Sequence, residues 1–347
     1  MSNTMIAAIL HEHGGREAIR LEQVPVPEPR PGEVRVQVRA CALNWLDVGI
    51  RQGPKFGPIP LPLIGGGDIA GVVDTVGADV TGWKAGDEIL VYPLLGCGAC
   101  EFCRQGELAT CPNHRIIGEH VNGGLAEFTI VPAANLLPKP ANLSFDEAAA
   151  LPVVLMTAWH MLIEVGGLQA GEDVLISGAG GGVASMGIQI AHYAGARVFT
   201  TTSTPEKAGY ARELGAAEVF NYREEDWAAR AREVTNDRGV DLVQDNVGAA
   251  TWSSALCALA RNGRLVTCGS HSGTRVELEI SQIYHRQLQI LGSNGGTYDG
   301  LSTALALVEE GRIHPVIDSV LPLEQIREGH RLLEEGEHFG KVVIAIN

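Results

Sequence analysis

Residues 173–202 read DVLISGAGGGVASMGIQIAHYAGARVFTTT, and this stretch decides the fold. Apolar runs at 173–177 and 197–202 flank a run of glycines and a segment of helical periodicity at 183–196. Two short apolar strands joined by one helix predict a parallel strand–helix–strand unit. Glycines before such a helix let the backbone approach a pyrophosphate, which the free N–H groups of the helix end attract. The stretch therefore predicts a dinucleotide-binding fold.

The same alternation of strands and helices continues from about residue 171 to about residue 295. Further strands are expected at 218–222, 240–248 and 264–270, and helices at 205–216, 224–236 and 251–263. Connections this short predict a doubly wound parallel sheet with helices on both faces.

The first part of the chain has a different pattern. Residues 1–145 are rich in turns and in short apolar or alternating runs, which predict a β-rich domain. Its expected strands lie at 33–40, 69–76, 88–95 and 126–132. Ser144 and Glu147 then have the spacing of a capping box, so a helix is expected from residue 144 to residue 165.

We therefore expect an α/β fold in three segments. Residues 1–145 form the β-rich domain, residues 146–300 form the dinucleotide-binding domain, and residues 301–347 return to the first domain. The last segment contains a polar helix at 323–336 and a terminal strand, which are too short to fold alone.

Composition and charge exclude several classes of partner. Of 347 residues, 45% are hydrophobic and 19% are charged, which is sufficient for a packed core. A formal net charge of −15 is repelled by nucleic acid and by anionic membranes. No run approaches 18 apolar residues, and the start lacks the pattern of a secretory signal. We expect a cytoplasmic protein with a small-molecule substrate, no nucleic acid and no membrane partner.

The glycine run departs from the strict G-x-G-x-x-G pattern, because its sixth position is a valine. Shifted by one residue, it fits a variant with alanine at both ends. We expect the cofactor pyrophosphate to contact Ala179, Gly181, Gly182, Val183 and Ala184. A flexible glycine-rich loop is the alternative, and the flanking strands and helix argue against it.

The end of the second strand indicates which dinucleotide is bound. NAD sites usually place an Asp or Glu there, to accept from the ribose 2′-OH. Here the strand ends in Thr202 and Ser203, and Lys207 follows shortly after. Hydroxyls and a nearby cation suit a 2′-phosphate, so NADP(H) is favoured and NAD(H) is the alternative. Lys207 could equally lie on a solvated helix face, as most lysines do.

Four of the seven cysteines are close together in the sequence: Cys97, Cys100, Cys103 and Cys111. Their spacing lets short turns collect four thiolates around one Zn²⁺. Four cysteine ligands leave no open coordination position, which is typical of a structural site. We expect one structural zinc per chain. A metal-free cluster and disulfides are the alternatives.

The order of these segments resembles the medium-chain dehydrogenase/reductase superfamily. A β-rich domain with a four-cysteine lobe comes first, a dinucleotide-binding domain follows, and a short C-terminal segment returns to the first domain. Further matching stretches lie at 67–73 (GDIAGVV), 123–128 (GGLAEF) and 339–343 (FGKVV). The resemblance implies a GroES-like domain and a Rossmann domain. It also implies further cofactor contacts from Tyr222, Asn246, Gly269 and Lys341.

Zinc alcohol dehydrogenases of this superfamily hold a second, catalytic zinc with a Cys, a His and a third Cys or Glu. The matching positions here are Asn44, Gly67 and the vicinity of Val153, so the resemblance implies that all three ligands are lost. Asn44 followed by Asp47 is similar to the quinone oxidoreductase branch, whose members use NADPH and usually lack both zincs. The intact four-cysteine lobe departs from that branch.

These residues favour reduction over alcohol oxidation. An alcohol is difficult to activate without a Lewis acid, whereas a conjugated carbonyl accepts hydride when hydrogen bonds stabilise its oxygen. We expect NADPH-dependent reduction of a quinone or an α,β-unsaturated carbonyl compound. Asn44 and Trp45 would donate hydrogen bonds, and Asp47 would orient them. A structural turn is the alternative role for Asn44.

Two other functions stay open. One is an alcohol dehydrogenase with an atypical catalytic metal or none, and the other is a dinucleotide-binding protein without turnover. His11, His13, His120 and His160 offer an unexpected metal site, although none has a second ligand at a diagnostic spacing. We also expect self-association as a homodimer or homotetramer.

Overall fold

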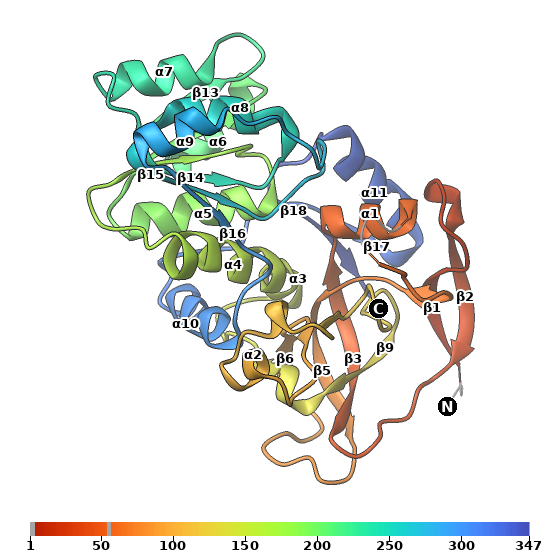
Figure 1. Cartoon of the computed structure of the whole chain (residues 1–347). Coiled ribbons are helices and arrows are strands. Elements are labelled where there is room, and N and C mark those ends of the chain that lie inside the picture. Colours follow the sequence, from red (N-terminus) through yellow and green to blue (C-terminus); the bar gives the residue numbers. More distant parts are fainter. Residues whose placement is uncertain (1–3, 54–56, 347) are drawn as a thin grey trace. The chain divides into compact units, whose positions relative to one another are not determined.

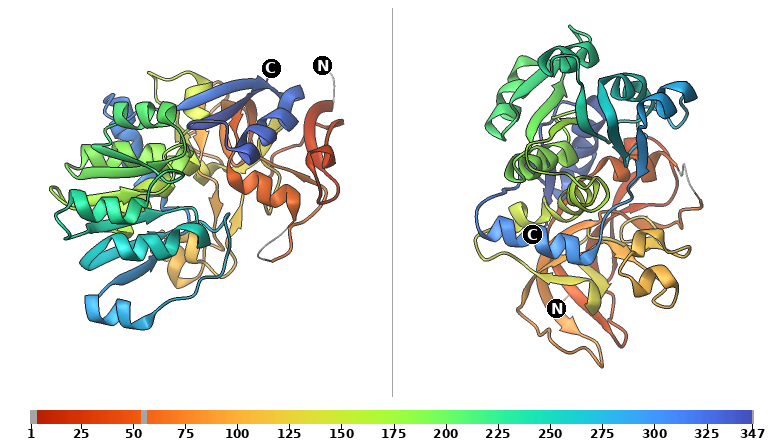
Figure 2. Two further views of the ribbon diagram at one scale, coloured as in Figure 1. Left: turned by 90° about the horizontal axis from the view of Figure 1, so that it is seen from above. Right: turned by 60° about the vertical axis from the view of Figure 1, so that its left-hand side comes forward.

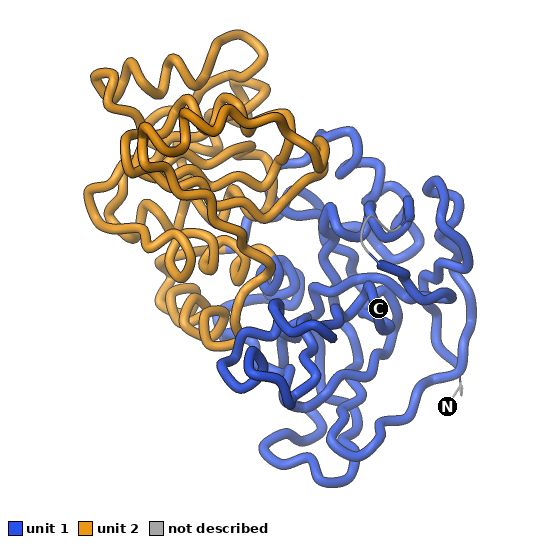
Figure 3. The backbone as a smooth tube through the Cα atoms, in the orientation of Figure 1, with its two compact units in different colours: residues 1–153, 315–347 blue, residues 154–314 orange. Residues whose placement is uncertain are grey.

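The computed structural model describes residues 4–53 and 57–346, which form two compact units (Figures 1 and 3). Unit 1 comprises residues 1–153 and 315–347, and unit 2 comprises residues 154–314. Residues up to His314 stay with unit 2 because Gln189 exchanges two hydrogen bonds with the His314 backbone, each 3.0 Å long.

Unit 2 contains a six-stranded parallel sheet with the strand order β13-β12-β11-β14-β15-β16. Its strands are β11 (Asp173–Ile176), β12 (Arg197–Thr202), β13 (Glu218–Asn221), β14 (Val240–Asp245), β15 (Leu259–Thr267) and β16 (Gln289–Gly292). The order reverses between β11 and β14, and dinucleotides bind at such a reversal in doubly wound folds. The predicted doubly wound parallel sheet is confirmed.

Helices lie on both sides of this sheet (Figure 2). They are α5 (Gly182–Tyr193), α6 (Pro205–Glu213), α7 (Trp227–Val234), α8 (Ala249–Ala258), α9 (Ile280–Arg286) and α10 (Tyr298–Glu309). Because helices cover both faces, the central strands are buried along their length, as the apolar run of β11 predicts.

The expected helices over 144–165 and 251–263 differ from the structure in ways that have a clear physical cause. The helix expected over 144–165 is divided into α3 (Phe145–Ala149), α4 (Pro152–Trp159) and a π-helix (His160–Val165). Pro152 lacks an N–H and its ring displaces the preceding turn, so the helix is interrupted before it. The helix expected over 251–263 ends at Ala258, because the buried Leu259 already pairs with Val240 of β14.

The main sheet of unit 1 has the order β10-β6-β5-β3-β18-β17, and β9 also pairs with β3. These strands are β3 (Glu33–Ala42), β5 (Asp68–Val76), β6 (Glu88–Val91), β9 (Phe128–Pro132), β10 (Leu136–Pro138), β17 (Ile317–Pro322) and β18 (Lys341–Ala345). Val34, Val36 and Val38 alternate along β3 and are buried in the core, so the pattern expected over 33–40 is present.

Shorter elements complete unit 1. Two small sheets contain β1 (Thr4–Leu10), β2 (Ile19–Pro25) and β4 (Leu63–Ile64), and β7 (Leu94–Leu95) and β8 (Arg115–Ile116). Besides α3, unit 1 contains the helices α1 (Trp45–Gln52), α2 (Glu101–Arg104) and α11 (Ile326–Glu335). No helix in the described part of the chain is long and apolar enough to span a membrane.

The C-terminal strand β18 gives unit 1 the geometry of its polar site. It lies between β3 and β17, antiparallel to β3, with Val343 opposite Ala42. Since α1 follows directly after β3, this pairing brings the start of β18 to the start of α1. Residues almost 300 positions apart in the sequence therefore meet there.

Candidate active site

Polar side chains gather around the start of α1 in unit 1. We call Asn44, Asp47, Asp68 and Lys341 the Asn44 cluster. Asn44 is half-buried between β3 and α1, and its Nδ2 donates to Asp68 Oδ2 at 2.8 Å. Its Oδ1 accepts from Lys341 Nζ at 2.6 Å. The amide predicted as a donor is thus held by one charge at each end.

Lys341, for which the family resemblance implies a cofactor contact, lies inside this cluster and is only 3% exposed. Its ammonium also donates to Asp68 Oδ2 at 2.8 Å and to the Leu43 carbonyl oxygen at 2.7 Å. Asp68 is fully buried, and its Oδ1 accepts from the Val153 N–H at 2.6 Å. The charges of Lys341 and Asp68 are therefore paired and hydrogen-bonded, as burial requires.

Asp47 holds the backbone of the site. Its two carboxylate oxygens accept from the N–H groups of Asn44 at 2.7 Å and of Gly66 at 3.1 Å. Burial raises the pKa of Asp47 to about 6, against the lowering effect of these donors and of Lys341. Asp47 therefore fixes the loops around Asn44, while Trp45, 40% exposed, lies at the surface.

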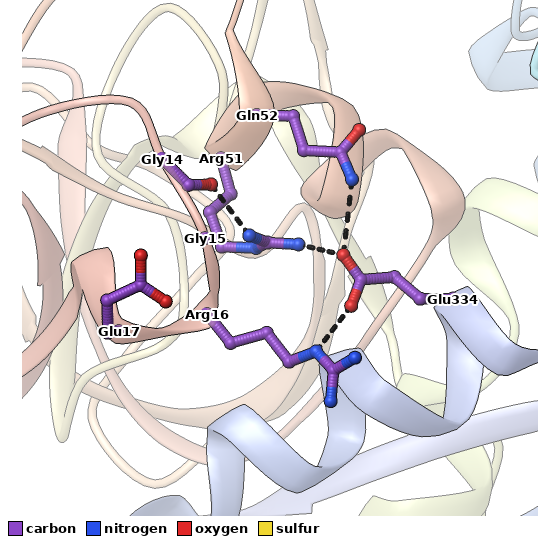
Figure 4. Close-up of a pocket in the computed structure, with 7 residues that line it drawn as sticks. All are labelled: Gly14, Gly15, Arg16, Glu17, Arg51, Gln52 and Glu334. Atoms are coloured by element: carbon purple, nitrogen blue, oxygen red, sulfur yellow. Dashed lines mark hydrogen bonds and ion pairs between the residues drawn. The ribbon is translucent and has the colours of Figure 1, made fainter.

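The opposite end of α1 is fixed to α11 by ion pairs (Figure 4). Arg51 is 1% exposed, donates to the Gly14 carbonyl oxygen at 2.7 Å and pairs with Glu334. Arg16 and Gln52 also donate to the Glu334 carboxylate, at 2.5 and 3.2 Å. These groups line a polar pocket of about 660 Å³. Sequence reasoning missed this network, because its members are far apart in the chain.

His330 of α11 contacts this network through Arg51 and is 3% exposed. The Nε–H of Arg51 points at its Nδ1 at 3.4 Å. Burial lowers the pKa of His330 to about 4, and the nearby positive charge of Arg51 adds to the effect. The imidazole is therefore neutral at pH 7 and accepts from the guanidinium.

In unit 2, the glycine loop after β11 is held against β12. The Gly178 N–H donates to Thr201 Oγ1 at 3.0 Å, and the Ala179 N–H donates to the Thr201 carbonyl at 2.8 Å. Gly178 has a φ of +75°, which glycine adopts without strain. Of the predicted contacts, Ala179 in the loop and Ala184 in α5 are fully buried. The others, Gly181, Gly182 and Val183, are half-buried at the start of α5.

The buried side-chain oxygens without a hydrogen-bond partner at the carboxyl edge of the sheet include Thr202 Oγ1 and Asn246 Oδ1. Thr202 ends β12 and Asn246 follows β14, so they flank β11 at the reversal of strand order. Gly269 lies against Asn246, since a Cβ there would be 2.1 Å from the Asn246 carbonyl oxygen. Unsatisfied buried oxygens at this edge fit a polar ligand such as a dinucleotide.

The loop after β12 carries the residues predicted to select the cofactor. Ser203 is half-buried, and Thr204 caps α6 by accepting from the Lys207 N–H at 3.3 Å. Because β13 pairs with β12, Tyr222 and Arg223 follow at the same edge, and both are exposed. Arg223 was not predicted, although a cation directly after Tyr222 was visible in the sequence.

The four cysteines of the lobe converge as the spacing predicts. Their sulfur atoms all lie within 4.8 Å of one another, with Cys100 and Cys103 3.5 Å apart. A tetrahedral zinc with Zn–S bonds of about 2.3 Å requires sulfur separations of about 3.8 Å. The donor set therefore fits the ion. Gly96 is required here, because a Cβ would be 2.6 Å from Cys103 Sγ.

The histidines considered for an alternative metal site make other contacts. Among residues 4–53 and 57–346, the four cysteines are the one group of metal-ligand side chains close enough to share an ion. His11 pairs with Glu22, and His13 contacts the Ile50 carbonyl. His120 accepts from the Ile116 N–H, and His160 lies 2.7 Å from Ser293 Oγ.

The sequence matches two families of known domains. Residues 30–141 match the alcohol dehydrogenase GroES-like domain, and residues 182–310 match the zinc-binding dehydrogenase family. An NAD-dependent alcohol dehydrogenase of Sulfolobus acidocaldarius is 34% identical over 99% of this chain and 100% of its own. The chain belongs to the medium-chain dehydrogenase/reductase superfamily.

Other members of the superfamily differ in reaction. The acryloyl-coenzyme A reductase of Sulfurisphaera tokodaii is 30% identical over 95% of this chain and 97% of its own. A solved NAD-dependent alcohol dehydrogenase superposes with a TM-score of 0.96 at 45% identity, covering 99% of this chain and 100% of its own. A crotonyl-CoA carboxylase/reductase in complex with NADP gives a TM-score of 0.92 at 25% identity, with coverages of 99% and 95%.

Membership in the superfamily confirms the predicted GroES-like and Rossmann domains and the prediction of an oxidoreductase. It does not decide between the reactions of its members.

The stability of unit 1 should depend on pH through His330. In the unfolded chain its imidazole binds a proton near pH 6.5, whereas in the fold it does so only near pH 4. Between these values the unfolded state binds more protons, so lowering the pH destabilises the fold. From pH 7 to pH 5, the titration of His330 lowers the free energy of unfolding by about 2 kcal/mol.

A comparison of variants isolates this effect, because the raised pKa of Asp47 acts in the opposite direction below pH 6. Between pH 7 and pH 5, we expect the free energy of unfolding of His330→Gln to fall by about 2 kcal/mol less than that of the wild type. Denaturant unfolding at both pH values measures the difference. His11→Gln, at an exposed site, is the control. If the free energy of unfolding fell equally in the wild type and in His330→Gln, the pKa of His330 would not differ between the folded and unfolded states.

Proposed function

We propose that this protein is an NADPH-dependent reductase that transfers hydride to a quinone or an α,β-unsaturated carbonyl compound without a catalytic zinc. The Asn44 amide carries the proposal. Two buried charges hold it, and one hydrogen of Nδ2 is left for a substrate oxygen. Asn44, Gly67 and Val153 offer no thiolate, imidazole or carboxylate where related dehydrogenases bind zinc, which supports the same reaction.

The reaction needs stabilisation of negative charge on an oxygen. NADPH, held by residues at the carboxyl edge of the unit 2 sheet, would supply hydride to the β-carbon, and the electron pair of the double bond would move toward the carbonyl oxygen. Asn44 Nδ2 donates to that oxygen as it gains charge. Asp47 keeps the Asn44 backbone in place during this step. A proton from solvent then adds to the α-carbon.

The relatives support this class of substrate. They include an acryloyl-coenzyme A reductase and a crotonyl-CoA reductase. Acryloyl-CoA and crotonyl-CoA are thioesters whose carbonyl is conjugated to a double bond. Such thioesters belong in the panel of test substrates. Alcohol oxidation is the second candidate, and the 45% identity to a solved NAD-dependent alcohol dehydrogenase favours it.

The four-cysteine lobe is proposed to hold one structural zinc. The convergence of the four sulfur atoms supports it, and so do the N–H groups of Cys97 and Cys103, which donate to Cys111 and Cys100 sulfur at 3.4 Å each. Such donors stabilise thiolates. When bound, the ion would connect the turn at Cys97 to α2 and to the segment ending at Cys111.

NADPH is proposed as the cofactor. The unsatisfied oxygens of Thr202 and Asn246 support a dinucleotide, and Ser203, Lys207 and Arg223 at the same edge of the sheet support a 2′-phosphate. Arg223 extends the set expected from the sequence, because a guanidinium can bind a phosphate through two hydrogen bonds. The complex of a crotonyl-CoA carboxylase/reductase with NADP is consistent with this choice.

Self-association stays a prediction, and β16 is its proposed face. This strand is at the edge of the unit 2 sheet, and the exposed Ile280 and Tyr284 of α9 lie before it, at 73% and 62% exposure. Unpaired edges and exposed apolar side chains favour pairing with a second copy. The mass in solution decides between a monomer and the homodimer or homotetramer that we expect. A cytoplasmic location also stays a prediction.

Removing the Asn44 amide should abolish most activity. We expect Asn44→Ala to lower kcat by about 10²-fold, as the loss of one oxyanion donor does. The assay is NADPH consumption with quinones, enones and enoyl thioesters, before and after a chelator that leaves the lobe zinc in place. Asn142→Ala, at an exposed position of unit 1, is the control. Much faster turnover of simple alcohols, lost on chelation, would contradict the proposal.

Elemental analysis should give one zinc per chain. Cys100→Ser removes one ligand, so we expect lower zinc content and a lower Tm, since structural zinc binding is coupled to folding. Cys257→Ser is the matched control, because Cys257 is exposed and outside the lobe. Two zincs per wild-type chain would reveal a second site.

The wild type should bind NADPH more tightly than NADH. Lys207→Ala with Arg223→Ala should weaken NADPH binding by about tenfold or more, because charge-assisted hydrogen bonds to the 2′-phosphate are lost. NADH binding should change little. Titration of nicotinamide fluorescence measures both, with Arg212→Ala in the last turn of α6 as control. Equal or tighter binding of NADH by the wild type would refute the preference.

A further inference from the structure

The Asn44 cluster contains two full charges that are shielded from solvent. Lys341 and Asp68 are 3% and 0% exposed, with Nζ and Oδ2 2.8 Å apart. Burying an ion pair seldom stabilises a protein more than apolar residues of similar size would. The contacts of this pair indicate another role.

The pair contacts both ends of one amide. Lys341 Nζ donates to Asn44 Oδ1, and Asn44 Nδ2 donates to Asp68 Oδ2. A flipped amide would place its NH₂ group against the ammonium and its oxygen against the carboxylate, and both contacts would be repulsive. The two charges therefore permit a single orientation of Asn44.

The Lys341–Asp68 pair also finds all its hydrogen-bond partners within the protein and needs no ligand to supply them. The ammonium has three hydrogens, and Leu43, Asn44 and Asp68 supply three acceptors. The second oxygen of Asp68 accepts from the Val153 N–H. By contrast, Asn44 is half-buried and keeps one Nδ2 hydrogen beyond those contacts.

We infer that Lys341 and Asp68 are positioning residues that aim the remaining Nδ2 hydrogen of Asn44 at the substrate oxygen. This inference rests on the proposed function. It assigns Lys341 to the amide instead of to the cofactor. A flipped amide would present its own oxygen to the charge developing on the substrate and would hinder the reaction.

The test removes both charges together. Lys341→Met alone would leave the Asp68 carboxylate buried and unpaired, which destabilises a fold strongly. Lys341→Met with Asp68→Asn avoids this and keeps an acceptor for the Val153 N–H. We expect kcat to fall about tenfold, because the amide is no longer held in one orientation. The Kd for NADPH should stay within about twofold.

Making the same two substitutions in an Asn44→Ala background tests whether the charges act through Asn44. We expect kcat to fall by less than about twofold there, because the amide on which the charges act is absent. Lys139→Met is the matched control. Lys139 is also buried in unit 1, with its ammonium 2.5 Å from the Leu143 carbonyl and 3.2 Å from Glu88.

A readout without turnover uses the side-chain amide resonances of ¹⁵N-labelled protein. The pair of signals that Asn44→Ala removes identifies Asn44, and these signals should move in the Lys341→Met, Asp68→Asn variant but not in Lys139→Met. Unmoved signals would overturn the inference, even if the wild type reduces no substrate of the panel and the proposed function fails. Weaker NADPH binding with unchanged kcat, or an equal loss of kcat in the Asn44→Ala background, would overturn it as well.

Discussion

The buried ammonium of Lys341 must find three acceptors, and the candidate active site is built around this requirement. An unpaired charge in a protein interior costs several kcal/mol. The three oxygens come from the end of β3, the start of α1 and the start of β5. β18 therefore has to lie where its first residue reaches all three, and its antiparallel register with β3 provides this position. One side chain thus constrains three strands and a helix.

The parts of the molecule that depend on local sequence were predictable. Strand and helix alternate within about 30 residues in a parallel unit, so the sheet of unit 2 followed from the apolar runs and glycines alone. The four cysteines lie within one short segment, and their convergence followed from their spacing. Helix ends were less predictable. Leu259 begins β15 instead of ending α8, because pairing with Val240 buries it.

The polar contacts of unit 1 could not be predicted, because they depend on tertiary structure. Lys341 and Asp68 are 273 positions apart in the sequence, and Arg51 and Glu334 are 283 apart. One signal was nevertheless present. Lys341 and Asp68 each begin an apolar strand, in FGKVV and GDIAG, and a charge in such a setting is buried only with a partner. The sequence indicated that each needs a partner, but not which one.

Both ends of α1 are held by the C-terminal segment of the chain. Lys341 of β18 contacts Asn44 at its start, and Glu334 of α11 pairs with Arg51 in its last turn. A helix fixed at both ends cannot rotate or shift without breaking either the Arg51–Glu334 ion pair or the hydrogen bond from Lys341 to Asn44, so the direction of the Asn44 amide is constrained twice. This constraint matters for a hydrogen-bond donor, whose stabilisation of charge depends on direction as well as distance. Residues 315–347 therefore determine the geometry of a site whose proposed donor lies in the first 50 residues.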